Sequence, residues 1–238
     1  MRTRAGAQAG AGSGRAGGGR SAGAAAGRDG DRGRALVRFG DRVRDLPRTG
    51  PAAAITATRD GEYLGTAEAG FTNQPEAVYQ RLRGRNADLD QVTARVIPLP
   101  PPLTPRRVGR DRFHDVVLSP TSSTRRTQLR ADINHPILFD HPVDHAPGML
   151  LLEAVRQTAY CSAFPRRGVL TAMEMRFFRY AELNSPCWIE TTPAADGTTA
   201  AGRHPVRVLA RQNGEDVFTA TATITTTAPA PLRVFATP

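Results

Sequence analysis

The longest apolar run of the chain, PGMLLLEAVRQTAYCSA, extends from Pro147 to Ala163. Apolar side chains occupy almost every face of a helix drawn through this run, and a helix of that kind has to be enclosed by other elements. The helix is expected to begin near Pro147. Glu153 and Arg156 interrupt the apolar pattern three residues apart, on one face of the helix. The pattern predicts a buried helix that carries a carboxylate and a guanidinium.

Apolar positions elsewhere in the second half of the chain recur at every second residue, as in half-buried strands. Asn213-Gly214 joins two such stretches and predicts a hairpin turn, because both residues accept positive φ. A helix enclosed by antiparallel strands then needs a curved sheet around it. The predicted strands lie in FHDVVLSP (113–120), TRRTQLRADI (124–133), 169–177, around Trp188 and Ile189, and in 205–225.

The first half of the chain is less regular. Residues 61–84 predict a short strand followed by a helix, with Pro75 in its first turn. The prolines of 96–110 exclude α-helix and central strand, and predict a stiff linker at a domain boundary. Residues 1–34 are mostly Gly, Ala and Arg and predict a disordered, dispensable tail. Residues 229–238 are expected to be a flexible C-terminus.

The formal charge of +10 is concentrated near the start of the chain, where residues 1–60 hold twelve arginines and five acidic residues. This segment lacks the interleaved aromatic residues that stack on bases, so a nucleic-acid role is not favoured. All basic residues are arginine, as GC-rich DNA encodes, and a wrongly chosen start codon in such DNA would produce this composition. Without a signal-like or membrane-spanning run, we expect a soluble, cytoplasmic protein with no membrane partner.

The two cysteines, Cys161 and Cys187, form no CxxC pair and have no zinc-like histidine spacing. We therefore interpret them as small buried side chains in a reducing compartment. The sequence predicts no metal site.

The run HPILFDHPVDHAPGMLLLEAVRQ (135–157) resembles the signature of the A-factor biosynthesis hotdog family, the gamma-butyrolactone synthases of filamentous bacteria. It is more distantly similar to the 3-hydroxyacyl-carrier-protein dehydratases. The resemblance covers residues 61 to about 228 and implies an α+β hotdog fold at 111–228. Members usually carry two hotdog repeats in tandem, whereas here 35–95 resembles only a truncated remnant of the first, without its long helix or glutamate.

The resemblance implies an acyltransferase of signalling-molecule or secondary-metabolite biosynthesis, without a cofactor. A 3-oxoacyl group would pass from an acyl carrier protein thioester to dihydroxyacetone phosphate, and the ester would then cyclise toward a butenolide. The N–H groups of Gly148 and Met149 would polarise the thioester carbonyl at the helix start. Glu153, in an apolar wall with raised basicity, would be the general base. Arg156 would hold the phosphate or orient Glu153.

Other readings stay open. Glu153 and Arg156 are also interpretable as a self-satisfied ion pair. His141 or His145 is a candidate second acid or base, with helix capping or loop packing as the alternative. The remaining histidines, His114, His135 and His204, have no evident partner in the sequence and are taken as structural.

Two alternatives to the acyltransferase interpretation also stay open. A hotdog dehydratase or thioesterase would use Glu153 without needing a phosphate-binding arginine. An inactive truncated module would bind acyl chains or a partner, and the absent first-repeat glutamate favours it. Separately from these functions, the resemblance implies a homodimer through the hotdog sheet.

Overall fold

The computed structural model of this 238-residue chain describes residues 36–40, 52–71, 74–193 and 202–226. The predicted tail at 1–34 and the predicted flexible C-terminus at 229–238 lie outside the described residues. Within the described part of the chain, no helix has the length and apolar character needed to cross a membrane.

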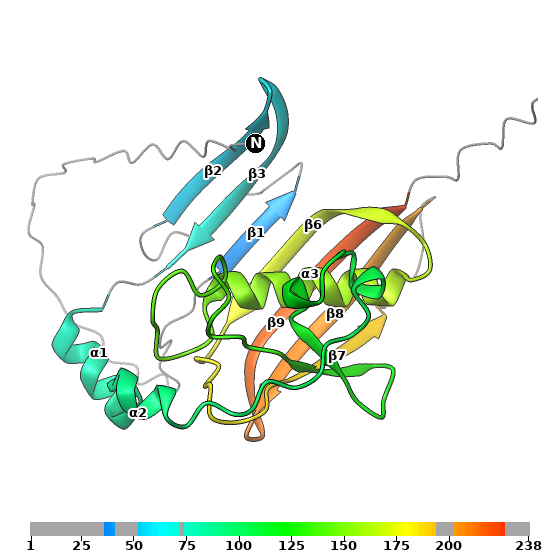
Figure 1. The fold of residues 1–238 in the computed structure, drawn as a ribbon. Coiled ribbons are helices and arrows are strands. Elements are labelled where there is room, and N and C mark those ends of the chain that lie inside the picture. The colour runs from blue at the N-terminus through cyan, green and yellow to red at the C-terminus, as the bar shows by residue number, and fades with distance from the viewer. Residues whose placement is uncertain (1–35, 41–51, 72–73, 194–201, 227–238) are drawn as a thin grey trace, which may run out of the picture.

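One antiparallel sheet of nine strands organises the described residues, in the order β2-β3-β1-β6-β9-β8-β7-β5-β4. Figure 1 shows the strands curving behind the central helix. The strands are β1 Leu36–Gly40, β2 Ala52–Arg59, β3 Glu62–Gly70, β4 Leu118–Pro120, β5 Arg126–Leu129, β6 Gly168–Phe177, β7 Trp188–Pro193, β8 Arg203–Gln212 and β9 Glu215–Thr226.

The long helix α3, Gly148–Ala163, lies across the middle of this sheet and confirms the predicted buried helix. It packs against β6, β8 and β9 on one side and against the loops that precede it on the other. Its side chains at Leu150, Ala154 and Val155 are buried in the same core as Phe218 of β9. Burial of a large apolar side chain contributes about 1.5–3 kcal/mol, so this core stabilises the enclosed position of α3.

The hairpin predicted at Asn213-Gly214 is present between β8 and β9, with φ values of 53° and 83° at the two residues. Strand β6 follows its predicted alternation only in part, because Met173 and Met175 are buried while Val169 is exposed. A bulge between Leu170 and Ala172 explains the difference. An extra residue in one strand shifts the alternation by one position.

The stretch 113–120 differs from the predicted strand. It begins with a 3-10 helix at Phe113–Asp115 and keeps only the short strand β4. The cause is tertiary, because the Gln157 amide of α3 donates to the Asp115 carbonyl at 2.7 Å and accepts from the Val117 N–H at 3.0 Å. The Gln157 side chain thereby hydrogen-bonds the Asp115 carbonyl and the Val117 N–H, which in a longer strand would pair with the neighbouring strand.

The first half of the chain supplies β1, β2 and β3, which extend the sheet beyond β6. The predicted helix after Pro75 is α1, Glu76–Arg83, and it is followed by a 3-10 helix at Gly84–Ala87 and by α2, Leu89–Thr93. In Figure 1, α1 and α2 lie to one side of the sheet, and no helix of the described chain covers β1–β3 as α3 covers β6–β9. The reading of 35–95 as a remnant repeat stays a prediction.

The Pro-rich segment 96–110 is largely irregular, with a 3-10 helix at Pro105–Val108. The segment also contributes to the hydrophobic core, because Leu103 and Val108 are buried in it. The Ile97 N–H also donates to the Leu183 carbonyl at 3.0 Å. The predicted linker is therefore packed onto the sheet and helix, and it forms part of the wall around α3.

Candidate active site

The carboxylate of Glu153 is the centre of a polar cluster inside the fold, with 9% of the residue exposed. Arg156, one turn further along α3, binds both carboxylate oxygens, with Nε 2.7 Å from Oε2 and Nη2 2.8 Å from Oε1. Arg110 from the Pro-rich segment binds the same two oxygens, at 2.9 and 2.8 Å. Gln157 adds a third donor at 2.6 Å. The cluster therefore holds two guanidinium groups on one carboxylate.

This environment lowers the pKa of Glu153 and contradicts the expectation of raised basicity. Burial by itself raises the pKa, but the hydrogen bonds and charges of Arg156, Gln157 and Arg110 lower it by more. The wall around the carboxylate is therefore polar and positive, where the sequence suggested an apolar one. Glu153 stays ionised at neutral pH and is a weak proton acceptor there.

Arg156 is committed to several partners at once. Its Nη2 also donates to the Val108 carbonyl at 3.3 Å, and its guanidinium lies 4.8 Å from the centre of the Tyr160 ring. Arg110 is more accessible, since 38% of its side chain is exposed. Two positive charges around one negative charge leave a net charge of +1, which favours an anion next to the cluster.

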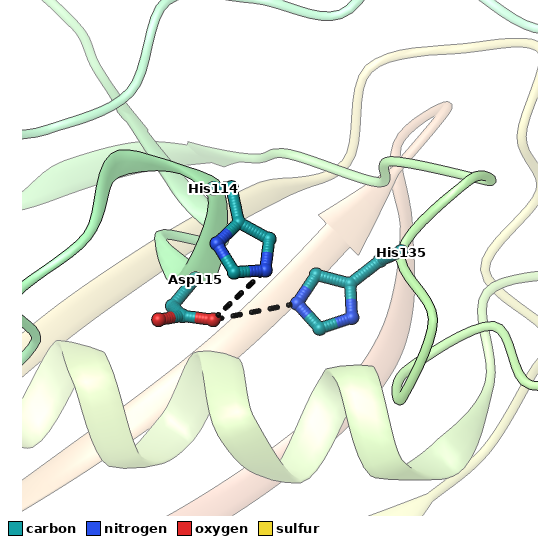
Figure 2. Close-up of side chains that lie close together, drawn as sticks. All are labelled: His114, Asp115 and His135. Carbon is teal, nitrogen blue, oxygen red and sulfur yellow. Dashed lines mark ion pairs between the residues drawn. The ribbon is translucent and has the colours of Figure 1, made fainter.

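A second group of titratable side chains lies on the other side of Gln157. His114 and Asp115 come from the 3-10 helix at Phe113–Asp115, and His135 comes from the loop that precedes α3. Figure 2 shows the Asp115 carboxylate directed at both imidazoles, with Oδ1 3.3 Å from His114 Nε2 and 3.7 Å from His135 Nε2. The two rings stack with their centres 5.0 Å apart. Both histidines therefore share a partner that the sequence did not reveal.

These three side chains approach one another closely enough to raise the question of a metal ion. The tautomer of His135 does not fit one, because its Nδ1 accepts the N–H groups of Ile137 and Leu138 at 3.2 and 3.1 Å. The ring proton of neutral His135 is consequently on Nε2. A metal ion would need the lone pair of that same nitrogen, which the proton occupies. Rotating the ring by half a turn would set a carbon against the two backbone donors. The cluster presents an N–H and is not built as a ligand set.

His145 belongs to a third network, at the junction of α1 with the loop before α3. Its Nδ1 lies 2.6 Å from Asp144 Oδ1, and Asp144 also accepts from Tyr79 and from the buried Arg83, each at 2.7 Å. Burial lowers the pKa of His145, against the opposing effect of Asp144. Arg83 Nη1 also donates to Glu182 Oε1 at 2.6 Å. This arrangement corresponds to the loop-packing alternative, since no side chain caps the start of α3.

The other candidates are more exposed. His141 pairs with its neighbour Asp140 at 2.7 Å on the surface. Gly148 and Met149 form the exposed first turn of α3. Within the described residues, no hydrogen bond or ion pair joins His141 or His145 to the Glu153 cluster, whereas Arg156 is joined to it directly. Their assignment as catalytic or binding residues stays a prediction.

Neither cysteine takes part in these clusters. Cys187 is buried and Cys161 partly buried, both as free thiols, which agrees with the sequence interpretation. Burial raises the pKa of the Cys187 thiol to about 12.

Sequence reasoning missed Gln157, Arg110 and Asp115. The spacing of Gln157, four residues after Glu153, places both on one helical face and would have been sufficient to find it. No local signal identifies Arg110 or Asp115, because each reaches the helix from a distant irregular segment.

A long helix enclosed by a curved antiparallel sheet, with a buried carboxylate bound by two arginines, defines a hotdog-type protein with a polar site at its central helix. The chain belongs to the A-factor biosynthesis hotdog domain family, whose model matches residues 92–228.

Curated relatives agree with this assignment. The chain is 47% identical over 167 residues to a protein of Streptomyces virginiae named 2-oxo-3-(phosphooxy)propyl 3-oxoalkanoate synthase, covering 69% of this chain and 54% of that protein. It is 46% identical to a protein of the same name from Streptomyces coelicolor, covering 66% of this chain and 48% of that protein. The chain thus spans about half the length of the curated relatives it matches.

Solved structures resemble the fold at a greater distance. The tesB protein of Mycobacterium avium subs paratuberculosis matches with a TM-score of 0.45 and 14% identity, over 83% of this chain and 81% of that one. A conserved protein with a hot dog fold from Alicyclobacillus acidocaldarius matches with a TM-score of 0.46 and 15% identity, over 83% and 79%.

Proposed function

We propose that this chain carries out acyl transfer in the biosynthesis of A-factor-type gamma-butyrolactones. The product in the relatives' name is an ester of a 3-oxo acid with the primary hydroxyl of dihydroxyacetone phosphate. The proposed donor is a 3-oxoacyl thioester on an acyl carrier protein, and the proposed acceptor is dihydroxyacetone phosphate. The reaction forms a C–O bond at the thioester carbon, breaks its C–S bond and releases a thiol.

The observation that carries this proposal is the buried Glu153 carboxylate with Arg110 and Arg156 on both of its oxygens. Glu153 would act by fixing the two guanidinium groups, since its lowered pKa makes it a poor base. The donors left free on the arginines would then bind the acceptor phosphate, with Arg110 nearest to solvent. Planar guanidinium groups suit phosphate oxygens, which they bind through paired hydrogen bonds.

The acyl donor would approach the start of α3. Gly148 and Met149 lie in its first turn, where backbone N–H groups and the positive end of the helix dipole favour a polarised carbonyl oxygen. His141 and His145 lie in the loop that leads to the start of α3, and they stay candidates for contact with the acyl donor. Assembly as a homodimer through the sheet is proposed as well, and light scattering of the purified chain would test it.

The test is transfer from a 3-oxoacyl carrier protein to dihydroxyacetone phosphate, with the ester measured by mass spectrometry. Arg110→Met should raise KM for dihydroxyacetone phosphate and should affect unphosphorylated dihydroxyacetone much less. Arg112→Met, an exposed arginine two positions away, is the matched control and should behave like the unmutated chain. Equal loss of activity toward both acceptors in Arg110→Met would contradict the phosphate-binding role.

One observation favours a second function, an inactive module that binds acyl chains or a partner. Strands β1–β3 extend the sheet, but within the described residues no long helix accompanies them. The same assay separates the two functions, because a module would bind the acyl carrier protein thioester without forming ester or free thiol. A dehydratase or thioesterase would release water or free acid from the thioester without requiring a phosphorylated acceptor.

A further inference from the structure

The pair of stacked histidines beside the Glu153 cluster offers a proton acceptor, which the proposed acyl transfer still lacks. Transfer to an alcohol needs a group that accepts the hydroxyl proton. Glu153 is a poor candidate, because three donors hold its carboxylate in the ionised form. His114 and His135 are connected to the same cluster through Gln157, which donates both to Glu153 Oε1 and to the Asp115 carbonyl.

The surroundings of the two rings favour different tautomers. His135 Nδ1 accepts two backbone N–H groups, so its proton is on Nε2, which is buried and has no hydrogen-bond partner in the described chain. His114 Nε2 lies 3.3 Å from Asp115 Oδ1, whose negative charge favours the proton of the neutral ring on Nε2 and leaves the lone pair on Nδ1. No hydrogen bond within the described residues occupies that Nδ1. One ring thus offers a lone pair and the other an N–H.

The surroundings of the pair suit a small polar acceptor and an acyl chain. Arg110 and Gln157 both donate to Glu153 Oε1, and Gln157 also donates to the Asp115 carbonyl, so a phosphate bound at Arg110 would lie near the histidine pair. The neighbouring side chains Phe113 and Ile137 are apolar and are exposed to 61% and 74%. Burying this apolar surface would favour the binding of an acyl chain.

We propose that His114 and His135, paired on Asp115, form the acceptor-alcohol site of this protein. His114 Nδ1 takes the proton of the attacking hydroxyl while the hydroxyl oxygen bonds to the thioester carbon. The C–S bond then breaks, and the departing thiolate recovers the proton from His114. His135 Nε2–H donates a hydrogen bond to the keto oxygen of the acceptor and orients it. The assignment rests on the proposed function. It makes His114 the general base of the acyl transfer and His135 the residue that selects the acceptor.

The first experiment measures kcat and KM of the full chain with the 3-oxoacyl carrier protein and dihydroxyacetone phosphate. His114→Ala should lower kcat about 100- to 10,000-fold with little change in KM, and added imidazole should restore part of it. His135→Asn should raise KM for the acceptor about 3- to 10-fold, because a hydrogen bond to a neutral oxygen is lost. Asparagine keeps an acceptor for the Ile137 and Leu138 N–H groups, so the loop should still fold. His204→Gln, on β8, is the histidine control.

The outcomes distinguish this inference from the proposed function. An active unmutated chain whose His114→Ala variant keeps its kcat would overturn the histidine pair and leave acyl transfer intact. If the unmutated chain transfers nothing but hydrolyses the thioester in a His114-dependent way, acyl transfer is wrong and His114 remains the base. Inactivity in both reactions would overturn both. Restoration of a chelator-treated chain by Zn²⁺ would also overturn the pair, in favour of a metal site.

A measurement independent of activity tests the tautomers. Nitrogen-15 NMR of the histidine rings should find His135 with its proton on Nε2, and His135→Asn identifies its signals. A proton on His135 Nδ1 would contradict the arrangement on which the proposal stands.

Discussion

Arg110 and Glu153 are 43 residues apart in the chain, yet Nε and Nη2 of Arg110 lie 2.9 and 2.8 Å from the two oxygens of the Glu153 carboxylate. This contact ties the Pro-rich segment to the central helix. It also determines the electrostatics of the site, because the carboxylate holds a second arginine, Arg156, on the same oxygens.

Replacing Glu153 by glutamine should destabilise the fold as well as the site. Two guanidinium groups would face a neutral amide, and removing one partner of a buried ion pair costs about 3–5 kcal/mol. Arg110 is partly exposed, so we expect the lower end of this range, measured as the shift of the urea unfolding curve. The double variant Glu153→Leu/Arg156→Met should recover much of the loss. Unchanged stability of the single variant would show that the ion pair contributes little.

The same carboxylate should make stability depend on acid pH. Its folded-state pKa is below the ordinary value of a glutamate, so its contribution is complete above the unfolded-state pKa and is lost as the pH falls through the folded value. Urea midpoints measured from neutral pH into the acid range should fall less steeply in Glu153→Gln than in the unmutated chain. Glu62→Gln, at the exposed start of β3, should keep the full acid dependence. Parallel curves for Glu153→Gln and the unmutated chain would contradict the lowered pKa.

Arg83 should be essential for attaching α1 to the loop before α3. It is buried, binds Asp144 and Glu182, and lies 4.4 Å from the centre of the Tyr180 ring. Arg83→Met would leave Asp144 buried without its main cation, at a cost of about 3–5 kcal/mol. Arg81→Met changes an exposed residue of the same helix and should stay within about 0.5 kcal/mol. Thermal and urea unfolding of both variants provide the comparison.

Gly109 should be intolerant of a side chain because it supports Tyr160, the ring beneath Arg156. Its φ is +64°, and a Cβ would meet the Tyr160 ring at 2.7 Å. Gly214, in the β8–β9 turn, also has a positive φ, +83°, with open space around the position. Both alanine variants carry backbone strain of about 1 kcal/mol, so the additional loss in Gly109→Ala measures the clash. Equal unfolding midpoints for the two variants would mean that Tyr160 moves aside freely.

The sequence by itself determined the elements whose patterns are local. The apolar run at 147–163 requires enclosure and became α3, and Asn213-Gly214 fixed the β8–β9 hairpin through positive φ. The pairing of Glu153 with Arg156 was also readable, because helical spacing places residues three apart on one face.

Only the tertiary structure decided which groups meet at α3. Arg110 and Asp115 reach the helix, and His135 reaches Asp115, from irregular segments whose paths depend on packing. Periodicity carries no information about such paths. For the same reason the direction of the Glu153 pKa was mispredicted. Burial raises the pKa of a carboxylate, and here the guanidinium groups that lower it include one from a segment 43 residues away.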